Sequence, residues 1–101
     1  MKIAYECDKG WHDLIDRTLE LIDSVSKPDN FTITQIKEKF GELRIYYYPA
    51  NDMIDNIIEF AINESLTICE MCGKKGKLRY FYGWYKTLCN ECTIDWMKRY
   101  D

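Results

Sequence analysis

The stretch CEMCGKKGKLRYFYGWYKTLCNEC, residues 69–92, holds four of the five cysteines of the chain in two C-x-x-C pairs. Sixteen residues separate the first pair from the second. Two residues between cysteines let one tight turn aim both sulfurs at a single point, and two such pairs supply the four thiolates of a tetrahedral zinc site. The spacing therefore predicts one Zn²⁺ bound by Cys69, Cys72, Cys89 and Cys92.

Two disulfides, or four free thiols, are the alternatives to a metal site. The first residues, MKIAYECDKGWHD, contain no apolar segment typical of a secretion signal, so we expect a reducing, cytoplasmic setting, in which paired cysteines indicate metal ligands before disulfides. Cysteine fills all four ligand positions and leaves none for a catalytic water, so the predicted zinc is structural. Nearby lysines would compensate the thiolate charge or contact phosphate: Lys74, Lys75, Lys77 and Lys86.

The residues around the cysteines favour a finger with a knuckle, a hairpin and a helix. Gly73 suits the positive-φ position after the first pair. KLRYFY and WYKTL, joined at Gly83, have the composition of two short strands. CNECTIDWMKRYD has helical spacing, and its first turn would carry the last two ligands. We therefore expect a treble-clef zinc finger over residues 69–101.

The first 68 residues predict a small helix–hairpin–helix domain. Residues 10–26 and 51–66 have apolar residues at helical spacing, and Asn51 or Asp52 is a candidate cap of the second helix. Residues 31–48 predict two strands joined by a turn in which Gly41 supplies a positive-φ position. The expected apolar face of the second helix comprises Met53, Ile54, Ile57, Ile58, Phe60 and Ala61. The predicted class is thus α+β, with residues 1–68 as one domain and residues 69–101 as a finger packed on it.

The charge is distributed unevenly along the 101 residues. The net charge is −3, and it divides into −6 over residues 1–68 and +3 over residues 69–101. Four thiolates around one Zn²⁺ would lower the second value to about +1. A nucleic-acid binder usually has a larger basic excess, which counts against that class without excluding it. No apolar run approaches the roughly 18 residues of a membrane span, so no membrane partner is expected.

The hairpin and the finger contain the candidate contact residues. Lys37, Lys39 and Arg44 could form an anion-contacting cluster beside Phe40, or they could simply make ion pairs across the turn. Aromatic residues concentrate in YYY (46–48) and YFYGWY (80–85), where they pack in a core or bind a partner. Outside the hairpin, the candidates are Arg79 and Trp84.

Two further residues have ordinary structural explanations. His12 is expected at the start of a helix, and Cys7 is expected to be a small buried side chain with a pKa raised by Glu6 and Asp8. No nucleophile–base pair and no glycine-rich phosphate loop emerge, so we expect no enzyme activity.

The quoted cysteine segments carry a resemblance. CEMC and LCNEC are similar in spacing to treble-clef fingers, including GATA-type fingers, whose basic DNA-reading tail is absent here. Over nearly the whole chain, the segments KEKFGELRIYY, ICEMCGKKGKLR and WYKTLCNEC resemble a family of small uncharacterised proteins common in bacteriophages and prophages. That resemblance implies a phage setting inside a bacterial host, and a zinc-bound C-terminal half.

Three functions are therefore compatible with the sequence. The first is a protein that binds and modulates, most simply inhibits, a host protein. The second is a nucleic-acid-binding finger protein, which would use the basic and aromatic residues of the hairpin and finger. The third is a binder of a small nucleotide signal through the same groups. The sequence does not predict an oligomeric state.

Overall fold

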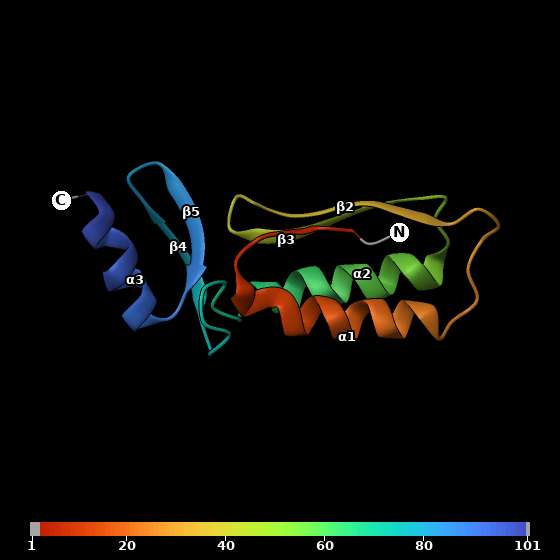
Figure 1. Ribbon diagram of the computed structural model, residues 1–101, viewed down its shortest axis with the longest axis horizontal. Coiled ribbons are helices and arrows are strands. Elements are labelled where there is room, and N and C mark those ends of the chain that lie inside the picture. Colours follow the sequence, from red (N-terminus) through yellow and green to blue (C-terminus); the bar gives the residue numbers. More distant parts are fainter. Residues whose placement is uncertain (1–2, 101) are drawn as a thin grey trace.

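A computed structural model describes residues 3–100 as two lobes placed end to end (Figure 1). The molecule measures 50 × 21 × 20 Å along its principal axes. Within the described residues there are three α-helices, a three-stranded sheet and a two-stranded sheet, so the predicted α+β class is confirmed. None of the helices in this part of the chain is long and apolar enough to cross a membrane.

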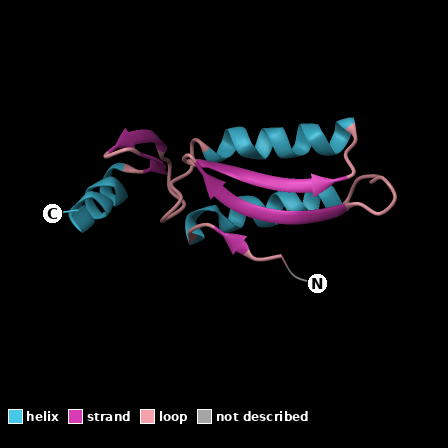
Figure 2. Cartoon of the chain, turned by 90° about the horizontal axis from the view of Figure 1, so that it is seen from above, coloured by secondary structure: helices cyan, strands magenta, loops and turns pink. Residues whose placement is uncertain are grey.

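The N-terminal lobe is a sheet in the order β1-β2-β3 with two helices on one face (Figures 1 and 2). β2 and β3 form an antiparallel hairpin, and β1 pairs in parallel with β2, Tyr5 opposite Ile36. β1 was not predicted, because two residues are too few to show the alternation of apolar and polar side chains that indicates a strand. The elements are β1 Tyr5–Glu6, a 3₁₀ turn Lys9–Trp11, α1 His12–Asp23, β2 Thr32–Lys39, β3 Glu42–Tyr48 and α2 Asp52–Ser65.

Side chains of the β2–β3 hairpin alternate between the buried and the exposed face. Leu43 and Ile45 are buried, whereas Tyr46 and Tyr48 face solvent. The two residues of its turn, Phe40 and Gly41, both have positive φ, 55° and 84°. This is the turn geometry that matches the twist of a hairpin, and the prediction that Gly41 occupies such a position is confirmed.

The core of this lobe lies between the helices and the sheet. Trp11, Ile15, Ile36, Leu43 and Ile54 are fully buried. The Trp11 indole, which would otherwise bury an unpaired donor, donates to the Ile68 carbonyl at 2.8 Å.

Hydrogen bonds explain where α2 begins and where α1 ends. The Asn51 side chain caps α2 by accepting from the Ile54 amide at 2.8 Å, as predicted. α1 ends at Asp23, three residues before the predicted end, and the Lys27 ammonium donates to the carbonyls of Ile22 and Asp23 there.

The predicted apolar face of α2 was too wide. Ile54, Ile58 and Ala61 are buried, but Met53 and Phe60 are 56% and 66% exposed. The helix contacts the rest of the lobe along one stripe only, and these two side chains lie outside it.

The C-terminal lobe is smaller. It contains β4 Lys77–Phe81, β5 Trp84–Leu88, α3 Asn90–Met97 and a 3₁₀ turn Lys98–Tyr100. Its buried apolar cluster is Cys69, Leu88 and Trp96, and Phe81 packs edge-on against Trp96 with ring centroids 4.8 Å apart. The two buried clusters draw on residues before and after position 68 respectively. The division into two domains at that position stays a prediction.

Candidate metal centre and the adjoining surface

The four predicted ligands lie together in the C-terminal lobe. The sulfurs of Cys69, Cys72, Cys89 and Cys92 are all within 4.8 Å of one another, and those of Cys72 and Cys89 are 3.7 Å apart. A tetrahedral ion with metal–sulfur bonds of about 2.3 Å places its sulfurs about 3.8 Å apart, whereas a disulfide requires about 2.05 Å. All four are free thiols. The cluster therefore has the dimensions of a metal site and could hold one ion.

The first cysteine pair lies in a tight turn held by backbone hydrogen bonds. The amide of Gly73 donates to the carbonyl of Cys69 at 2.9 Å, and the amide of Cys69 donates to the carbonyl of Lys74 at 2.7 Å. Gly73 has a φ of 85°, as its position after the pair predicted. This turn aims both sulfurs to the same side.

The second pair is positioned by the start of α3. Cys89 is the N-cap residue, and its sulfur accepts from the Cys92 amide at 3.4 Å. Cys92 then lies in the first turn, as the sequence predicted. This pair lies at the start of α3, directly after β5. The chain reverses direction in the β4–β5 hairpin, which brings the second pair next to the first.

The thiols influence one another electrostatically. Burial disfavours ionisation of Cys69, but backbone hydrogen bonds from Cys89, Cys72 and Met71 outweigh it and lower the pKa of that thiol to about 7. Burial, followed by hydrogen bonds with the neighbouring cysteine sulfurs, raises the pKa of Cys92 above its usual range. Four adjacent thiols cannot all ionise without a cation, and a bound dication would remove that obstacle.

Glu70, between the first two cysteines, connects this cluster to the N-terminal lobe. It is only 2% exposed. One carboxylate oxygen pairs with the Lys86 ammonium at 2.8 Å, and the other accepts from the Asp8 amide at 3.0 Å. Burial alone would lower the pKa of Lys86, but the hydrogen bond and charge of Glu70 outweigh it and raise that pKa. Lys86 therefore pairs with a buried carboxylate, and the thiolate or phosphate role expected for it stays a prediction.

Two glycines let the lobes approach each other closely. The amide of Gly10 donates to the Glu70 carbonyl at 2.7 Å, and a Cβ on Gly10 would lie 2.2 Å from the Cys69 carbonyl oxygen. At the other contact, the Thr87 hydroxyl donates to the Gly41 carbonyl at 2.7 Å. The joint between the lobes thus has backbone hydrogen bonds at the cysteine turn and a second contact between β5 and the β2–β3 turn.

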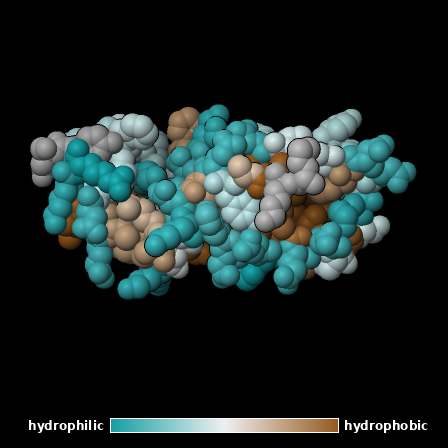
Figure 3. Space-filling view, viewed as in Figure 1, coloured by the Kyte–Doolittle hydropathy of each residue, from teal (hydrophilic) through white to brown (hydrophobic). Residues whose placement is uncertain are grey.

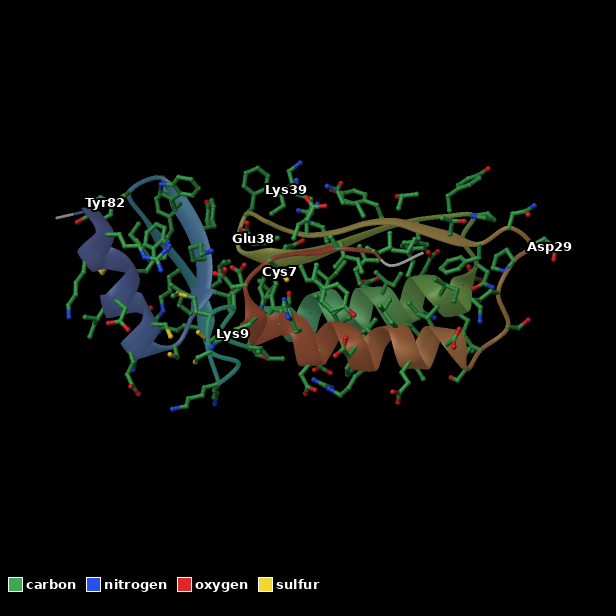
Figure 4. The ribbon with its side chains drawn as sticks, viewed as in Figure 1. Cys7, Lys9, Asp29, Glu38, Lys39 and Tyr82 are labelled. Atoms are coloured by element: carbon green, nitrogen blue, oxygen red, sulfur yellow. The ribbon has the colours of Figure 1, made fainter. Side chains whose placement is uncertain are left out.

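Three of the six predicted contact residues line one groove of about 360 Å³. They are Lys39 and Phe40, from the β2–β3 turn, and Trp84, from the start of β5; Glu38, Gly83 and Tyr85 complete it. Phe40 is 63% exposed and Trp84 is 53% exposed. Figure 4 shows Glu38 and Lys39 at the end of the hairpin that faces the C-terminal lobe. We call this the turn groove.

The other three candidates lie outside the turn groove. Arg44 pairs with Glu42, with 2.9 Å between Nε and Oε2. Arg79 donates to the carbonyl of Leu88 at 3.0 Å and to the Asn90 side chain at 2.8 Å. Lys37 lies opposite Arg44 in the β2–β3 register. The ion-pair alternative is thus realised for Arg44, though with its near neighbour on β3 and not across the hairpin.

Cys7 and His12 are separate from the cluster. His12 is the first residue of α1, as predicted, and its ring packs edge-on against Tyr5, 5.2 Å between centroids. Burial, then the charges of Glu70, Asp8 and Glu38, raise the pKa of Cys7 to about 12. The direction was predicted, but the leading cause is burial, and Glu70 acts where Glu6 was expected.

Comparison with known proteins adds no relative. No protein-family model matches the chain, and neither a curated protein nor a solved structure matches it.

Proposed function

We propose that this protein is a zinc-stabilised binding module, with Cys69, Cys72, Cys89 and Cys92 as ligands of one structural Zn²⁺. Soft thiolates in a closed four-coordinate set favour zinc over hard cations. When bound, such an ion supplies folding free energy. The order of cysteine turn, β4–β5 hairpin and α3 with two ligands at its start supports a treble-clef finger.

The turn groove is the proposed contact surface, and the conformation of the turn residues carries the proposal. Phe40 lines the groove and comes first in a two-residue turn, with a φ of 55°. Tyr82, with a φ of 53°, holds the same place in the β4–β5 turn, next to the groove residue Gly83, but does not itself line the groove. A side chain in this left-handed region costs about 1–2 kcal/mol, and hairpins usually place Asn or Asp there. Both aromatic rings are nonetheless well exposed, 63% and 65%. Strained positions with exposed aromatic area are typical of binding sites.

A protein partner fits this groove better than nucleic acid does. Binding nucleic acid requires several cations free to reach phosphates. Arg44, Arg79 and Lys86 already have partners within the chain. Lys39 is the cation of the groove lining, and Glu38 contributes a negative charge to the same lining. An aromatic centre with balanced charge is typical of a protein interface.

The phage-family resemblance supports a bacterial host protein as the partner and the host cytoplasm as the location, with inhibition of that partner as the simplest effect. We further propose that the protein does not catalyse a reaction. Its four proposed ligands leave no coordination site for a substrate, and the sequence contains no arguable nucleophile–base pair.

The test is affinity capture from host lysate, treated with nuclease or untreated, using the zinc-loaded protein and a Phe40→Ala, Trp84→Ala variant. We expect one host protein to be captured regardless of nuclease and to be lost with the variant. Tyr48→Ala is the matched control, because Tyr48 is 77% exposed but lies outside the groove.

Other outcomes would change the function. Capture that depends on intact nucleic acid and falls steeply with salt would favour the nucleic-acid alternative. Saturable binding of a free nucleotide in the groove would favour the signal-binding alternative. Turnover of any substrate by the pure protein would contradict the binding-module proposal.

A further inference from the structure

A second apolar groove runs between α1 and α2, away from the sheet. Its volume is about 460 Å³. Leu21 and Phe60 are the large hydrophobic residues of its lining that are exposed, at 51% and 66%. The residues that line this helix groove are Leu14, Arg17, Thr18, Leu21, Asn56, Ile57, Phe60, Ala61 and Glu64.

The helices that form the groove are strongly acidic. α1 and α2 together contain eight Asp and Glu residues against one arginine, a net charge of −7. That arginine, Arg17, is itself flanked by acids: its Nε lies 3.5 Å from an Asp13 carboxylate oxygen, and its Nη1 lies 3.9 Å from one of Glu64. Hydrophilic side chains follow the outer side of α1 along the lower edge of Figure 3. The groove is therefore an apolar strip within a negative field.

We propose that this helix groove binds a basic amphipathic helix of a partner protein. Two helices packed side by side present a trough in which a third helix can lie, with apolar anchors at i, i+4 and i+7. α2 has 14 residues and is therefore about 21 Å long, enough for about four turns of a partner. Lysines and arginines flanking the anchors would meet the acidic residues of both helices.

Charge distinguishes this occupant from the obvious competitors. A second copy of the chain would bring a face of −7 against a face of −7, and opposing like charges disfavour association. Anionic lipid surfaces would be repelled for the same reason. A cationic helix gains from the field and also buries the exposed rings and methyl groups.

This surface is independent of the turn groove, because no residue lines both. A partner on the helix groove would leave Phe40 and Trp84 accessible. The two proposals can therefore fail separately.

The test uses a fluorescent helical peptide of about 14 residues, with leucines at i, i+4 and i+7 and lysines on the flanks. Its matched control has glutamates in place of the lysines. Anisotropy with the zinc-loaded full chain should show saturable binding of the lysine peptide, at least about tenfold tighter than the glutamate peptide, and weakening with salt.

A Leu21→Ser, Phe60→Ser variant should bind the lysine peptide at least about tenfold more weakly. Both side chains are exposed, so the fold should persist, as circular dichroism and zinc content would verify. Phe40→Ala should leave the affinity unchanged.

Three results would overturn the proposal: no saturable binding of the lysine peptide, equal binding of the two peptides, or full retention of binding by the serine variant. Dimerisation of the wild-type chain that the serine variant abolishes would also overturn it, since the occupant would then be a second copy.

Discussion

The two lobes differ in what holds them together. Ten buried residues form the apolar cluster of the N-terminal lobe, whereas three form that of the C-terminal lobe, and one of these is the proposed ligand Cys69. Each fully buried aliphatic or aromatic side chain contributes roughly 1.5–3 kcal/mol. The first lobe therefore has the core of a small domain, and the second does not. A metal ion is the physically expected replacement for that missing core.

The joint between the lobes extends this contrast. The hydrogen bonds across it join Glu70 to Asp8 and Gly10, and Thr87 to Gly41, and the Leu78 side chain also approaches Gly41. Glu70 lies inside the cysteine turn, so the same turn that would bind the metal also holds the lobes in place. The turn groove, which draws residues from both lobes, depends on this arrangement.

The largest expected effect comes from a lost ligand. Cys72→Ser should abolish stoichiometric zinc binding and unfold at least residues 69–100, because the small apolar cluster cannot compensate for the metal. Elemental analysis and circular dichroism would measure both changes. Cys7→Ala is the control, and it should keep full zinc content; a loss of zinc in that control would mean that the ligand set is wrong.

The next effect concerns the buried ion pair at the joint. Glu70→Gln leaves the Lys86 ammonium without a counter-charge, and its side chain is only 13% exposed. Removal of one partner from such a pair costs about 3 kcal/mol or more, measurable by urea denaturation of the zinc-loaded protein. Adding Lys86→Met should restore part of the loss. If Glu70→Gln alone were as stable as the wild type, water would have to screen the charges of this pair.

Comparing alanine substitutions at two turn glycines separates the cost of backbone strain in a turn from the cost of disturbing the contact between the lobes. Gly41 and Gly83 have similar φ, 84° and 79°. A Cβ on Gly41 would lie 3.2 Å from the backbone of Tyr85 and Lys86 and 2.5 Å from Leu78 Cδ1, whereas one on Gly83 would meet nothing within 4 Å. Gly83→Ala should cost about 1 kcal/mol and Gly41→Ala about 1–3 kcal/mol more. Equal losses in thermal denaturation would mean that the hairpin does not dock on the finger.

The smallest effect concerns Cys7, whose folded-state pKa of about 12 lies above the ordinary thiol value of 9.0. Below pH 9 the thiol is neutral in both states. As the pH rises above 9, the unfolded thiol ionises first, so the stability falls progressively until the folded thiol ionises near 12. Alkylation of Cys7 by iodoacetamide, followed by mass spectrometry, should therefore accelerate at higher pH in the folded protein than in an unfolded peptide of the same segment. Coincident profiles would mean that Cys7 is solvated.

The pattern of neighbouring residues was sufficient to predict the helices, the hairpin turn and the cysteine cluster. Gly41 and Gly73 were correctly placed at positive φ because turn chemistry depends on adjacent residues. Each C-x-x-C pair likewise depends only on neighbouring residues, and the β4–β5 hairpin between the two pairs brings them together. These features are determined over short stretches of chain.

The joint between the lobes was not predictable from the sequence. Glu70 pairs with Lys86, 16 residues away, and with the Asp8 amide, 62 residues away, so no local pattern marks it as buried. Arg79 was offered as a contact residue, but its hydrogen bonds reach the end of β5 and the start of α3. The exposure of Phe60 depends on which stripe of α2 the sheet covers, and composition does not specify that.

The central claim is that a metal holds the C-terminal lobe while an apolar core holds the N-terminal lobe. Amide NMR spectra of the isotope-labelled, zinc-loaded protein, recorded before and after a strong chelator is added, test it most directly. We predict that amides of residues 69–100 lose dispersion, while those of α1, α2, β2 and β3 keep it apart from shifts beside the joint. Unchanged spectra, or a purified protein that contains no metal, would contradict the account.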